Sequence, residues 1–184
     1  IEDLAVVLDE VAVLTRPGAE SRRREAPGVA EALARHRRLR VLEAPATLDG
    51  GDVLLTETTV YVGQSERTNE EAVTQLRVVL SRPVIPVPVP DDLLHLLTGC
   101  SYLGNDLLLA TASLAARPEF ARLKHHLVPD DESGCANVLA VGNDLLLPDG
   151  YPRTASMLSN AGFRLHPVPI SEFEKRDGGV TCLS

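Results

Sequence analysis

Short apolar runs alternate with polar turns from the beginning of the chain. The runs 4–8 and 11–14 are rich in aliphatic residues and are joined by a charged pair, so they predict a hairpin. A helix is predicted over about 21–38, where apolar residues recur at helical spacing, with Ser21 as its cap and a start that Pro27 would delay. The first part of the chain therefore predicts two strands followed by a helix.

A third strand at 39–43 completes a first unit, and the same order of elements then returns. Strands are predicted at 53–55 and 60–62, a helix over about 69–80, and another strand at 84–87. Both stretches have the order strand, strand, helix, strand. The chain is therefore predicted to be a series of similar units.

The string Gly-Asn-Asp-Leu-Leu-Leu supports that repetition, because it occurs twice, at 104–109 and at 142–147. Each copy follows a predicted strand, at 101–103 and at 138–141. A string that returns at a fixed place in the pattern is typical of an internal-repeat fold. The sequence thus predicts an α/β fold of strand-strand-helix-strand units with symmetry about an axis.

The stretch 48–53 has the most distinctive chemistry, because Asp49 and Asp52 flank a glycine pair at the start of a strand. Adjacent glycines let the chain turn sharply, or let another segment approach the backbone closely. Taken alone, Asp49 is more simply a residue that caps a turn before a hairpin. The spacing of the units favours a functional interpretation instead.

Asp49 belongs to a set of titratable residues at matching places in the repeat. Asp3 lies 46 residues before Asp49, and His95 lies 46 residues after it, each ahead of the first strand of a unit. Cys182 follows His95 by 87 residues, which is close to the combined length of two slightly shorter units. Singly, these are a turn aspartate, a core histidine and a small buried thiol. At repeat spacing they are predicted to converge, as the titratable groups of an active site do.

Composition and charge limit the kinds of molecule that the chain is expected to bind. The chain has 184 residues, 44% of them hydrophobic and 24% charged, which suits one soluble domain with a sizeable core. The net charge of −8 argues against a nucleic-acid partner and suits a cationic substrate. The apolar runs are short and broken by proline, glycine or charge, and no signal-peptide pattern opens the chain, so no membrane partner is expected.

The cysteines and the methionine bear on the cellular setting. Cys100, Cys135 and Cys182 are an odd number without paired-ligand spacing, which predicts reduced thiols in the cytoplasm and neither a disulfide framework nor a zinc site. Ile1 opens the chain and Met157 is its single methionine, so a processed or truncated piece is expected. No metal or other cofactor is expected.

A thiol, a histidine and two carboxylates together suit chemistry on a guanidinium group. Cys182 is a weak nucleophile until it ionises, which requires a cationic neighbour, either protonated His95 or the substrate. A guanidinium presents a planar fork of donors that Asp3 and Asp49 could fix in front of the sulfur. His95 would protonate the departing amine and then activate water.

An ordered set of short segments carries a family resemblance. The segments are Glu2-Asp3, Thr15 to Ala19, Ser21 to Arg23, Leu48 to Leu54, Tyr61 to Gly63, Arg67 to Asn69, Leu94 to Leu96, Ser171 to Lys175 and Thr181-Cys182. Together they resemble the dimethylarginine dimethylaminohydrolases (dimethylargininases) of the amidinotransferase and arginine deiminase superfamily, over nearly the whole chain. The resemblance implies that residues 1–184 form a single catalytic domain of the pentein fold, a five-bladed pseudo-symmetric α/β propeller. It also implies hydrolysis of N-omega-methylated arginines to citrulline and methylamines through a covalent thiouronium on cysteine.

The resemblance also implies roles for individual residues. Cys182 would be the nucleophile and His95 the general acid and base, while Asp49 and Asp3 would hold the guanidinium. The implied substrate-binding set is Glu2, Asp3, Arg22 and Arg67, completed by the backbone near Arg176 and Asp177. Arg22 and Arg67 would bind the α-carboxylate, although from the sequence alone they are solvated arginines at helix starts. The implied partner is a small-molecule methylated arginine, and a homodimer stays open.

The sequence departs from the family pattern in three places. About one blade is expected to be missing before Ile1, and the last strand is expected to be cut short at Ser184. Such gaps would open the ring and expose strand edges. The third departure is at 96–98, where many relatives carry a lysine after a His-Leu pair.

Three alternative functions stay open. An arginine deiminase would use the same groups on unmethylated arginine, and an amidinotransferase would pass the amidino group to an amine instead of water. A pentein scaffold that binds other proteins would have lost the Cys-His-Asp set, which is present here. Arginine deiminases usually carry a long helical insertion, for which these short units leave no room. A hydrolase of methylarginines is therefore favoured.

Overall fold

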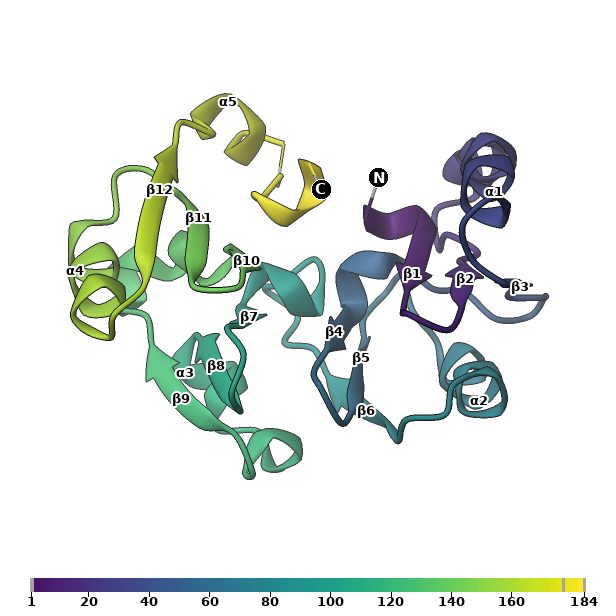
Figure 1. The fold of residues 1–184 in the computed structure, drawn as a ribbon, viewed down its shortest axis with the longest axis horizontal. Helices are drawn as coiled ribbons and strands as arrows, with labels where there is room; N and C mark the ends of the chain where they lie inside the picture. The colour runs from purple at the N-terminus through teal and green to yellow at the C-terminus, as the bar shows by residue number, and fades with distance from the viewer. Residues whose placement is uncertain (1, 177, 184) are drawn as a thin grey trace.

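Four three-stranded sheets follow one another in an arc in the computed structural model, which describes residues 2–176 and 178–183 (Figure 1). The strands are β1 (Ala5–Val7), β2 (Ala12–Leu14) and β3 (Leu39–Val41); β4 (Val53–Leu55), β5 (Val60–Gln64) and β6 (Val84–Pro88); β7 (Cys100–Tyr102), β8 (Leu107–Ala110) and β9 (Lys124–Leu127); and β10 (Leu139–Val141), β11 (Asp144–Pro148) and β12 (Arg164–Val168). In each sheet the first two strands form an antiparallel hairpin, and the third is parallel to the second. The predicted repeating unit is confirmed in each of these sheets.

Helices connect the second strand of each sheet to the third. They are the 3-10 helix η2 (Glu20–Glu25) with α1 (Ala26–Ala34), then α2 (Glu70–Val79), α3 (Ala112–Ala115) with the 3-10 helix η5 (Pro118–Phe120), and α4 (Pro152–Asn160), while α5 (Ser171–Glu174) follows the last sheet. The prediction of a helix over 69–80 is confirmed by α2, and Asn69 caps it by accepting the Ala72 N–H at 3.1 Å. None of the helices in the described part of the chain combines the length and the apolar character that crossing a bilayer requires.

The first helix differs from its prediction. The N-cap of η2 is Ala19, so the prediction of Ser21 as the cap was wrong, and α1 ends at Ala34, earlier than expected. Pro27 explains the late start, because its ring would clash with a preceding turn of continuous α-helix. In the first turn of α1 its missing N–H costs no hydrogen bond.

The repeated string occupies the hairpin turn ahead of the middle strand in the third and fourth sheets. In the third sheet, Gly104, Asn105 and Asp106 have φ values of 87°, 54° and 58°. In the fourth sheet, Gly142 has a φ of 61°. Glycine, asparagine and aspartate are the residues that tolerate this left-handed region best. Both copies thus reverse the chain into a leucine-rich strand, which confirms the internal repeat.

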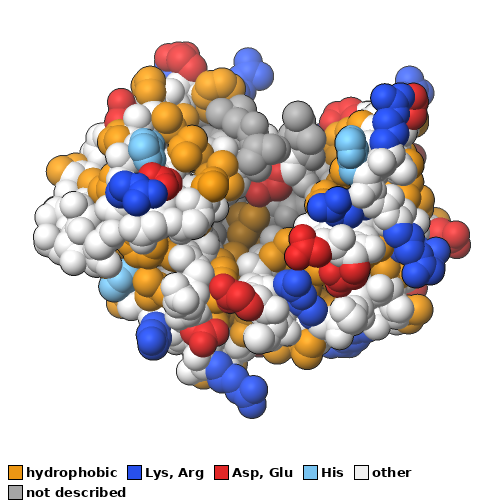
Figure 2. All heavy atoms as spheres, in the orientation of Figure 1, with side chains coloured by type: hydrophobic (Ala, Val, Ile, Leu, Met, Phe, Trp, Pro, Cys, Tyr) orange, Lys and Arg blue, Asp and Glu red, His pale blue; other side chains and the backbone are white. Residues whose placement is uncertain are grey.

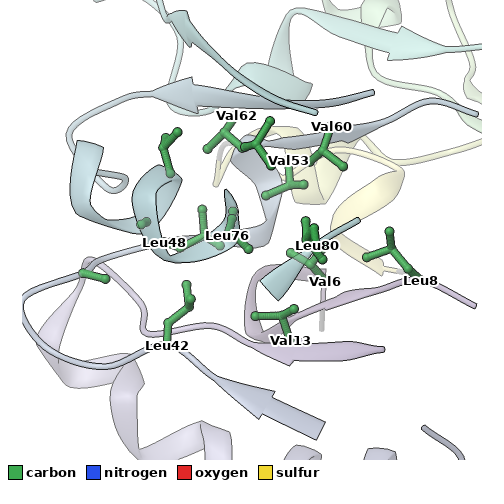
Figure 3. Close-up of a cluster of buried hydrophobic side chains, with 14 of the residues drawn as sticks. Val6, Leu8, Val13, Leu42, Leu48, Val53, Val60, Val62, Leu76 and Leu80 are labelled. Atoms are coloured by element: carbon green, nitrogen blue, oxygen red, sulfur yellow. The ribbon is translucent and has the colours of Figure 1, made fainter. Parts of the chain in front are cut away.

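The hydrophobic core is divided into clusters that neighbouring sheets share. One cluster joins the first two sheets and α2, and Val13, Val60 and Leu76 are completely buried in it (Figure 3). In the next cluster, the rings of Tyr61 and Phe120 meet with their centroids 5.0 Å apart. Burying one such side chain stabilises the fold by about 1.5–3 kcal/mol. Because each cluster is built by two sheets, packing fixes every sheet relative to its neighbour.

A short 3-10 helix precedes the first strand of each sheet. These helices are η1 (Glu2–Leu4), η3 (Gly50–Asp52), η4 (Leu96–Thr98) and η6 (Asp130–Ala136), and a further one, η7 (Thr181–Leu183), lies near the end of the described chain. Although η1 and η7 come from opposite ends of the chain, they lie side by side (Figure 1), and the Thr181 hydroxyl donates to Glu2 Oε2 at 3.0 Å. These short helices and the residues beside them carry the predicted site.

Candidate active site

The glycine pair lets η1 and η3 meet. A Cβ placed on Gly50 would lie 2.0 Å from the carbonyl oxygen of Glu2, so glycine is required there. The N–H of Gly51 donates to Asp3 Oδ1 at 3.0 Å. The close backbone approach predicted for this stretch is therefore confirmed, and it holds Asp3 against the second unit.

Asp49 and His95 come from corresponding places in adjacent units and contact each other. Asp49 Oδ2 lies 3.2 Å from His95 Nε2, and Asp49 Oδ1 accepts the Gly18 N–H at 2.9 Å. The Asp49 side chain is fully buried, so both of its oxygens are committed to the protein. In this geometry Asp49 orients the imidazole, and a direct contact with a guanidinium would require one of these bonds to open.

The charges around His95 favour its protonated form. Burial lowers the pKa of His95, but the hydrogen bond with Asp49 and the charges of Asp52 and Asp3 raise it by more, so the pKa lies above its ordinary value. The imidazole keeps 12% of its surface exposed and lines a cavity. A protonated imidazole in this position can deliver a proton to a leaving group.

Asp52, the second acid of the glycine stretch, supports the loop that carries His95. It is completely buried, and its Oδ1 accepts the Leu96 N–H at 2.9 Å. Its Oδ2 accepts the hydroxyls of Ser65 and Thr68, both at 2.6 Å. Burial raises the pKa of Asp52, and these hydrogen bonds oppose the rise only in part. Sequence reasoning gave Asp52 no role of its own, although its place beside the glycine pair was a usable signal.

The pKa values of the two acids of η1 are shifted in opposite directions. Burial raises the pKa of Asp3, but the Arg22 guanidinium, 2.5 Å from Oδ2, the Gly51 N–H and the charge of His95 together hold it below its ordinary value. For Glu2 burial dominates, so its pKa is raised. Asp3 is therefore a carboxylate at neutral pH, while Glu2 is the acid that lines the cavity.

Cys182 lines the same cavity as Glu2 and His95, a space of about 420 Å³. Its walls combine apolar and polar side chains, among them Leu94, Leu97, Ile170, Tyr151 and Glu174. Figure 2 shows the surface hollowed between the first two and the last two sheets, with acidic and apolar side chains inside. The predicted convergence of thiol, imidazole and carboxylates is therefore observed at one place.

The Cys182 thiol is neutral in the free protein. Burial raises its pKa and the carboxylates of η1 raise it further, while the Gly179 N–H, 3.5 Å from Sγ, opposes them only in part. Cys100 and Cys135 are buried, and burial raises their pKa as well, that of Cys135 to about 12. Cys182 is exposed, so it is the thiol that a substrate or reagent can reach.

Of the two predicted arginines, Arg22 contacts an acid of the site directly, and Arg67 contacts the site through its backbone, at Gly18. Besides its pair with Asp3, Arg22 forms a two-pronged contact with Glu25, at 3.4 Å from Nε and 3.3 Å from Nη2. Arg67 is half-buried, and a Cβ on Gly18 would lie 2.5 Å from its carbonyl oxygen. Gly18 is also the residue that donates to Asp49, so the Arg67 backbone packs against the residue that holds Asp49.

The remaining predicted positions lie near the end of the chain. Arg176 is exposed just beyond α5, and its N–H donates to the Phe173 carbonyl at 2.8 Å. Asp177 lies outside the described residues. Sequence reasoning gave no role to the cavity residues Asn137, Tyr151 and Glu174. Two of them had a usable signal, because Glu174 lies in a segment that carries the family resemblance and Asn137 lies just ahead of the first strand of the fourth unit.

Asp3, Asp49 and His95 each bring one ligand atom to within 4.8 Å of the others. By spacing and donor type alone these groups could hold a metal ion. However, Asp3 is paired with Arg22 and Asp49 with His95, so protein cations already compensate both acids. The set is better suited to proton transfer beside a cationic substrate.

Comparison with known proteins agrees with this geometry. No family model matches the chain. It is 37% identical over 188 residues to the N(G),N(G)-dimethylarginine dimethylaminohydrolase of Pseudomonas aeruginosa and 42% identical over 188 residues to that of Streptomyces coelicolor, and these alignments cover all of this chain and 74% and 72% of the relatives. The chain belongs to the dimethylarginine dimethylaminohydrolase family.

Solved structures confirm the fold of this family for the chain. A mutant of the P. aeruginosa dimethylarginine dimethylaminohydrolase, in complex with citrulline, superposes with a TM-score of 0.94 at 36% identity, over 98% of this chain and 72% of that one. The pentein fold implied by the sequence resemblance is thereby confirmed. The four sheets described above are blades of this family's propeller.

Proposed function

We propose that this chain hydrolyses N-omega-methylated arginines to citrulline and methylamines. The observation that carries the proposal is one cavity lined by the exposed Cys182 thiol, by Glu2 and by His95, which Asp49 orients. The activity named for the relatives, and the citrulline bound to the P. aeruginosa structure, support the same class of substrate. A cavity of about 420 Å³ also suits a small amino acid of this kind.

In the first step, the Cys182 sulfur attacks the central carbon of the guanidinium. The thiol is neutral at rest, and the arriving cation lowers its pKa, so the thiol proton passes to solvent as the sulfur–carbon bond forms. Protonated His95 donates its proton to the methylated nitrogen, the carbon–nitrogen bond breaks, and a methylamine leaves. The carbon stays attached to sulfur as a thiouronium.

In the second step, the neutral imidazole of His95 accepts a proton from water, and the oxygen attacks the thiouronium carbon. The carbon–sulfur bond breaks, citrulline is released, and the sulfur regains a proton. The same imidazole therefore acts first as an acid and then as a base. Asp49 suits both tasks because it holds the ring without leaving its buried position.

The acids and arginines around the cavity are proposed to bind the two ends of the substrate. Glu2 and Asp3 attract the guanidinium, with Glu2 at the cavity wall and Asp3 just behind it. Arg22 and Arg67 bind the α-carboxylate, for which a guanidinium fork is well shaped. Arg22 becomes available when its weak pair with Glu25 opens.

The cellular setting is proposed from composition. Three cysteines without a disulfide pattern suit a reducing cytoplasm, and the negative charge suits a cationic amino acid better than nucleic acid. We expect no membrane partner. Whether two copies form a homodimer is tested by light scattering on the purified protein.

The test is a citrulline-release assay with dimethylarginine, monomethylarginine and arginine side by side. The proposal predicts citrulline from the methylated substrates and little from arginine. Preferred turnover of arginine would instead identify an arginine deiminase. Transfer of the amidino group to an added amine would identify an amidinotransferase, and no turnover of any substrate would favour a binding scaffold.

A further inference from the structure

Asn137 connects the loop that carries Cys182 to the loop that carries His95. Its side chain is almost fully buried, and both ends of the amide are bonded. Nδ2 donates to the Leu97 carbonyl and to the Thr181 hydroxyl, each at 2.8 Å, and Oδ1 accepts the Thr181 N–H at 3.1 Å. Leu97 follows His95 by two residues, and Thr181 is the neighbour of Cys182. One amide therefore sets the spacing of two catalytic loops.

Gly179 packs against the side-chain amide of Asn137. A Cβ placed on Gly179 would lie 2.3 Å from Asn137 Oδ1 and 2.6 Å from its Cγ. The N–H of Gly179 faces Cys182 Sγ at 3.5 Å. Any side chain at position 179 would therefore have to move either this N–H and the thiol, or the Asn137 amide.

The fourth unit holds Asn137 in place. Asn137 is the C-cap of η6, and Glu132 within that helix is 5% exposed. Glu132 accepts the N–H groups of Arg153 at 3.1 Å and Thr154 at 2.7 Å, which anchors η6 to the start of α4. Asn137 ends η6 just ahead of the first strand of its unit, whereas Asp49 and His95 begin the corresponding helices η3 and η4. The helix that ends at Asn137 is thus tied to α4 through Glu132.

Resting on the function proposed above, we infer that Asn137 is a positioning residue that sets Cys182 relative to His95. An amide suits this task because one end donates twice while the other accepts. An aspartate of the same size would place an acceptor against the Leu97 carbonyl, and an alanine would leave both loops unbraced. A misplacement of about 1 Å between reacting groups can cost roughly 100-fold in rate.

The test is a double-mutant cycle of Asn137→Ala and Gly179→Ala in the full chain. Two rates are measured: kcat with dimethylarginine, and alkylation of Cys182 by iodoacetamide, located by peptide mass spectrometry. Asn137→Ala should lower kcat roughly 10- to 100-fold while KM changes less than about 3-fold. In the parent, Gly179→Ala should lower both rates, because the new methyl group collides with the Asn137 amide. In the Asn137→Ala variant that amide is absent, so adding Gly179→Ala should lower the rates by at most about 3-fold more.

Two further variants keep the inference testable. Asn143→Ala is the matched control, because this exposed asparagine also donates to a backbone carbonyl, that of Gly162 at 2.8 Å, and it should retain parent rates. Asn137→Asp should lose kcat as far as Asn137→Ala does, with thermal unfolding confirming that it is folded. The inference would be overturned if Asn137→Ala and Gly179→Ala lowered both rates by independent factors that multiply in the double variant. It would also be overturned if Asn137→Asp kept the rates of the parent. If the parent releases no citrulline, the proposed function fails, while the alkylation cycle still decides the role of Asn137.

Discussion

His95 Nε2 lies 3.2 Å from Asp49 Oδ2, and the aspartate is fully buried whereas the imidazole reaches the cavity. The two residues stand 46 positions apart and begin adjacent units of the repeat. The two residues meet because each begins the 3-10 helix ahead of the first strand of its unit, and these helix starts lie next to each other beside the cavity. The contact makes the charge of His95 depend on Asp49.

Asp49→Asn should lower the pKa of His95, since the substitution removes a charged hydrogen-bond partner that raises it. The loss of such a bond costs about 1.5–3 kcal/mol, which corresponds to roughly 10- to 100-fold in kcat. With a lower pKa, His95 loses its proton at a lower pH. The fall of kcat at high pH, where His95 can no longer protonate the leaving group, should therefore move to lower pH. The measurement is kcat against pH, together with an NMR titration of His95.

Asp144→Asn is the matched control for this prediction. Asp144 Oδ1 lies 2.8 Å from His166 Nε2 on the surface, so the variant removes the same kind of pair away from the cavity. Its kcat profile should match the parent. A profile that stays in place in Asp49→Asn would contradict the assigned role of Asp49.

Cys182→Ser should abolish turnover, because a hydroxyl is far less nucleophilic than a thiol activated by a cation. It should also remove alkylation by iodoacetamide at neutral pH. Cys100→Ser and Cys135→Ser should retain both properties if the variants fold, since these thiols are buried and have raised pKa values. Loss of turnover in Cys100→Ser with retention in Cys182→Ser would assign the nucleophile elsewhere.

Glu25→Gln should lower the KM for methylarginine. The Glu25 carboxylate contacts Nε and Nη2 of the Arg22 guanidinium. The α-carboxylate of the proposed substrate would bind to the same two nitrogens. An exposed pair of this kind is worth about 0.2–1 kcal/mol, so KM should fall roughly 1.5- to 5-fold at low salt, with kcat little changed. Glu20→Gln is the control, because Glu20 forms a similar pair with Arg23 at 3.4 Å. An unchanged or higher KM in Glu25→Gln would count against Arg22 as the carboxylate ligand.

Acid sensitivity of the fold should depend on Glu132. Burial raises the pKa of Glu132, but bonds from Thr154 and Arg153 outweigh it and lower the pKa from 4.5 to about 2. The folded state thus binds the proton more weakly than the unfolded chain, so the contribution of Glu132 to stability is complete above about pH 4.5 and is lost as the pH falls toward 2. Glu132→Gln should have a lower Tm at pH 7 and a shallower fall of Tm across this range. Parallel Tm curves for the two proteins would contradict this.

The units of the fold could be predicted from the sequence because their signals are local. Apolar runs and helical apolar spacing predicted β1 to β7, β10 and α2, and the repeated string marked two corresponding hairpins, while β9 and β12 were not predicted. The matching places of Asp3, Asp49 and His95 predicted their convergence, because symmetry turns sequence spacing into spatial position. In the first helix the cap at Ser21 was wrong, but the late start predicted from Pro27 was right, because α1 begins at Ala26.

The contacts of individual side chains could not be predicted, because they depend on segments far apart in the sequence. Asn137 bonds residues 40 and 44 positions away, and no local pattern encodes those partners. Asp52 was visible beside the glycine pair, but its bond to the Leu96 N–H exists only when the second and third units pack together. Glu25 likewise gains a role only because Arg22 lies between it and Asp3.

The most direct test of the central claim is mass spectrometry of the Cys182 peptide after an acid quench during turnover of dimethylarginine. Formation of the adduct uses protonated His95, whereas its hydrolysis needs the neutral imidazole, and the pKa of His95 is raised. An adduct with the mass of the substrate less dimethylamine should therefore appear on Cys182 and grow as the pH is lowered below that pKa. Citrulline release at such pH values with no adduct on Cys182, or with the adduct on another residue, would contradict the account.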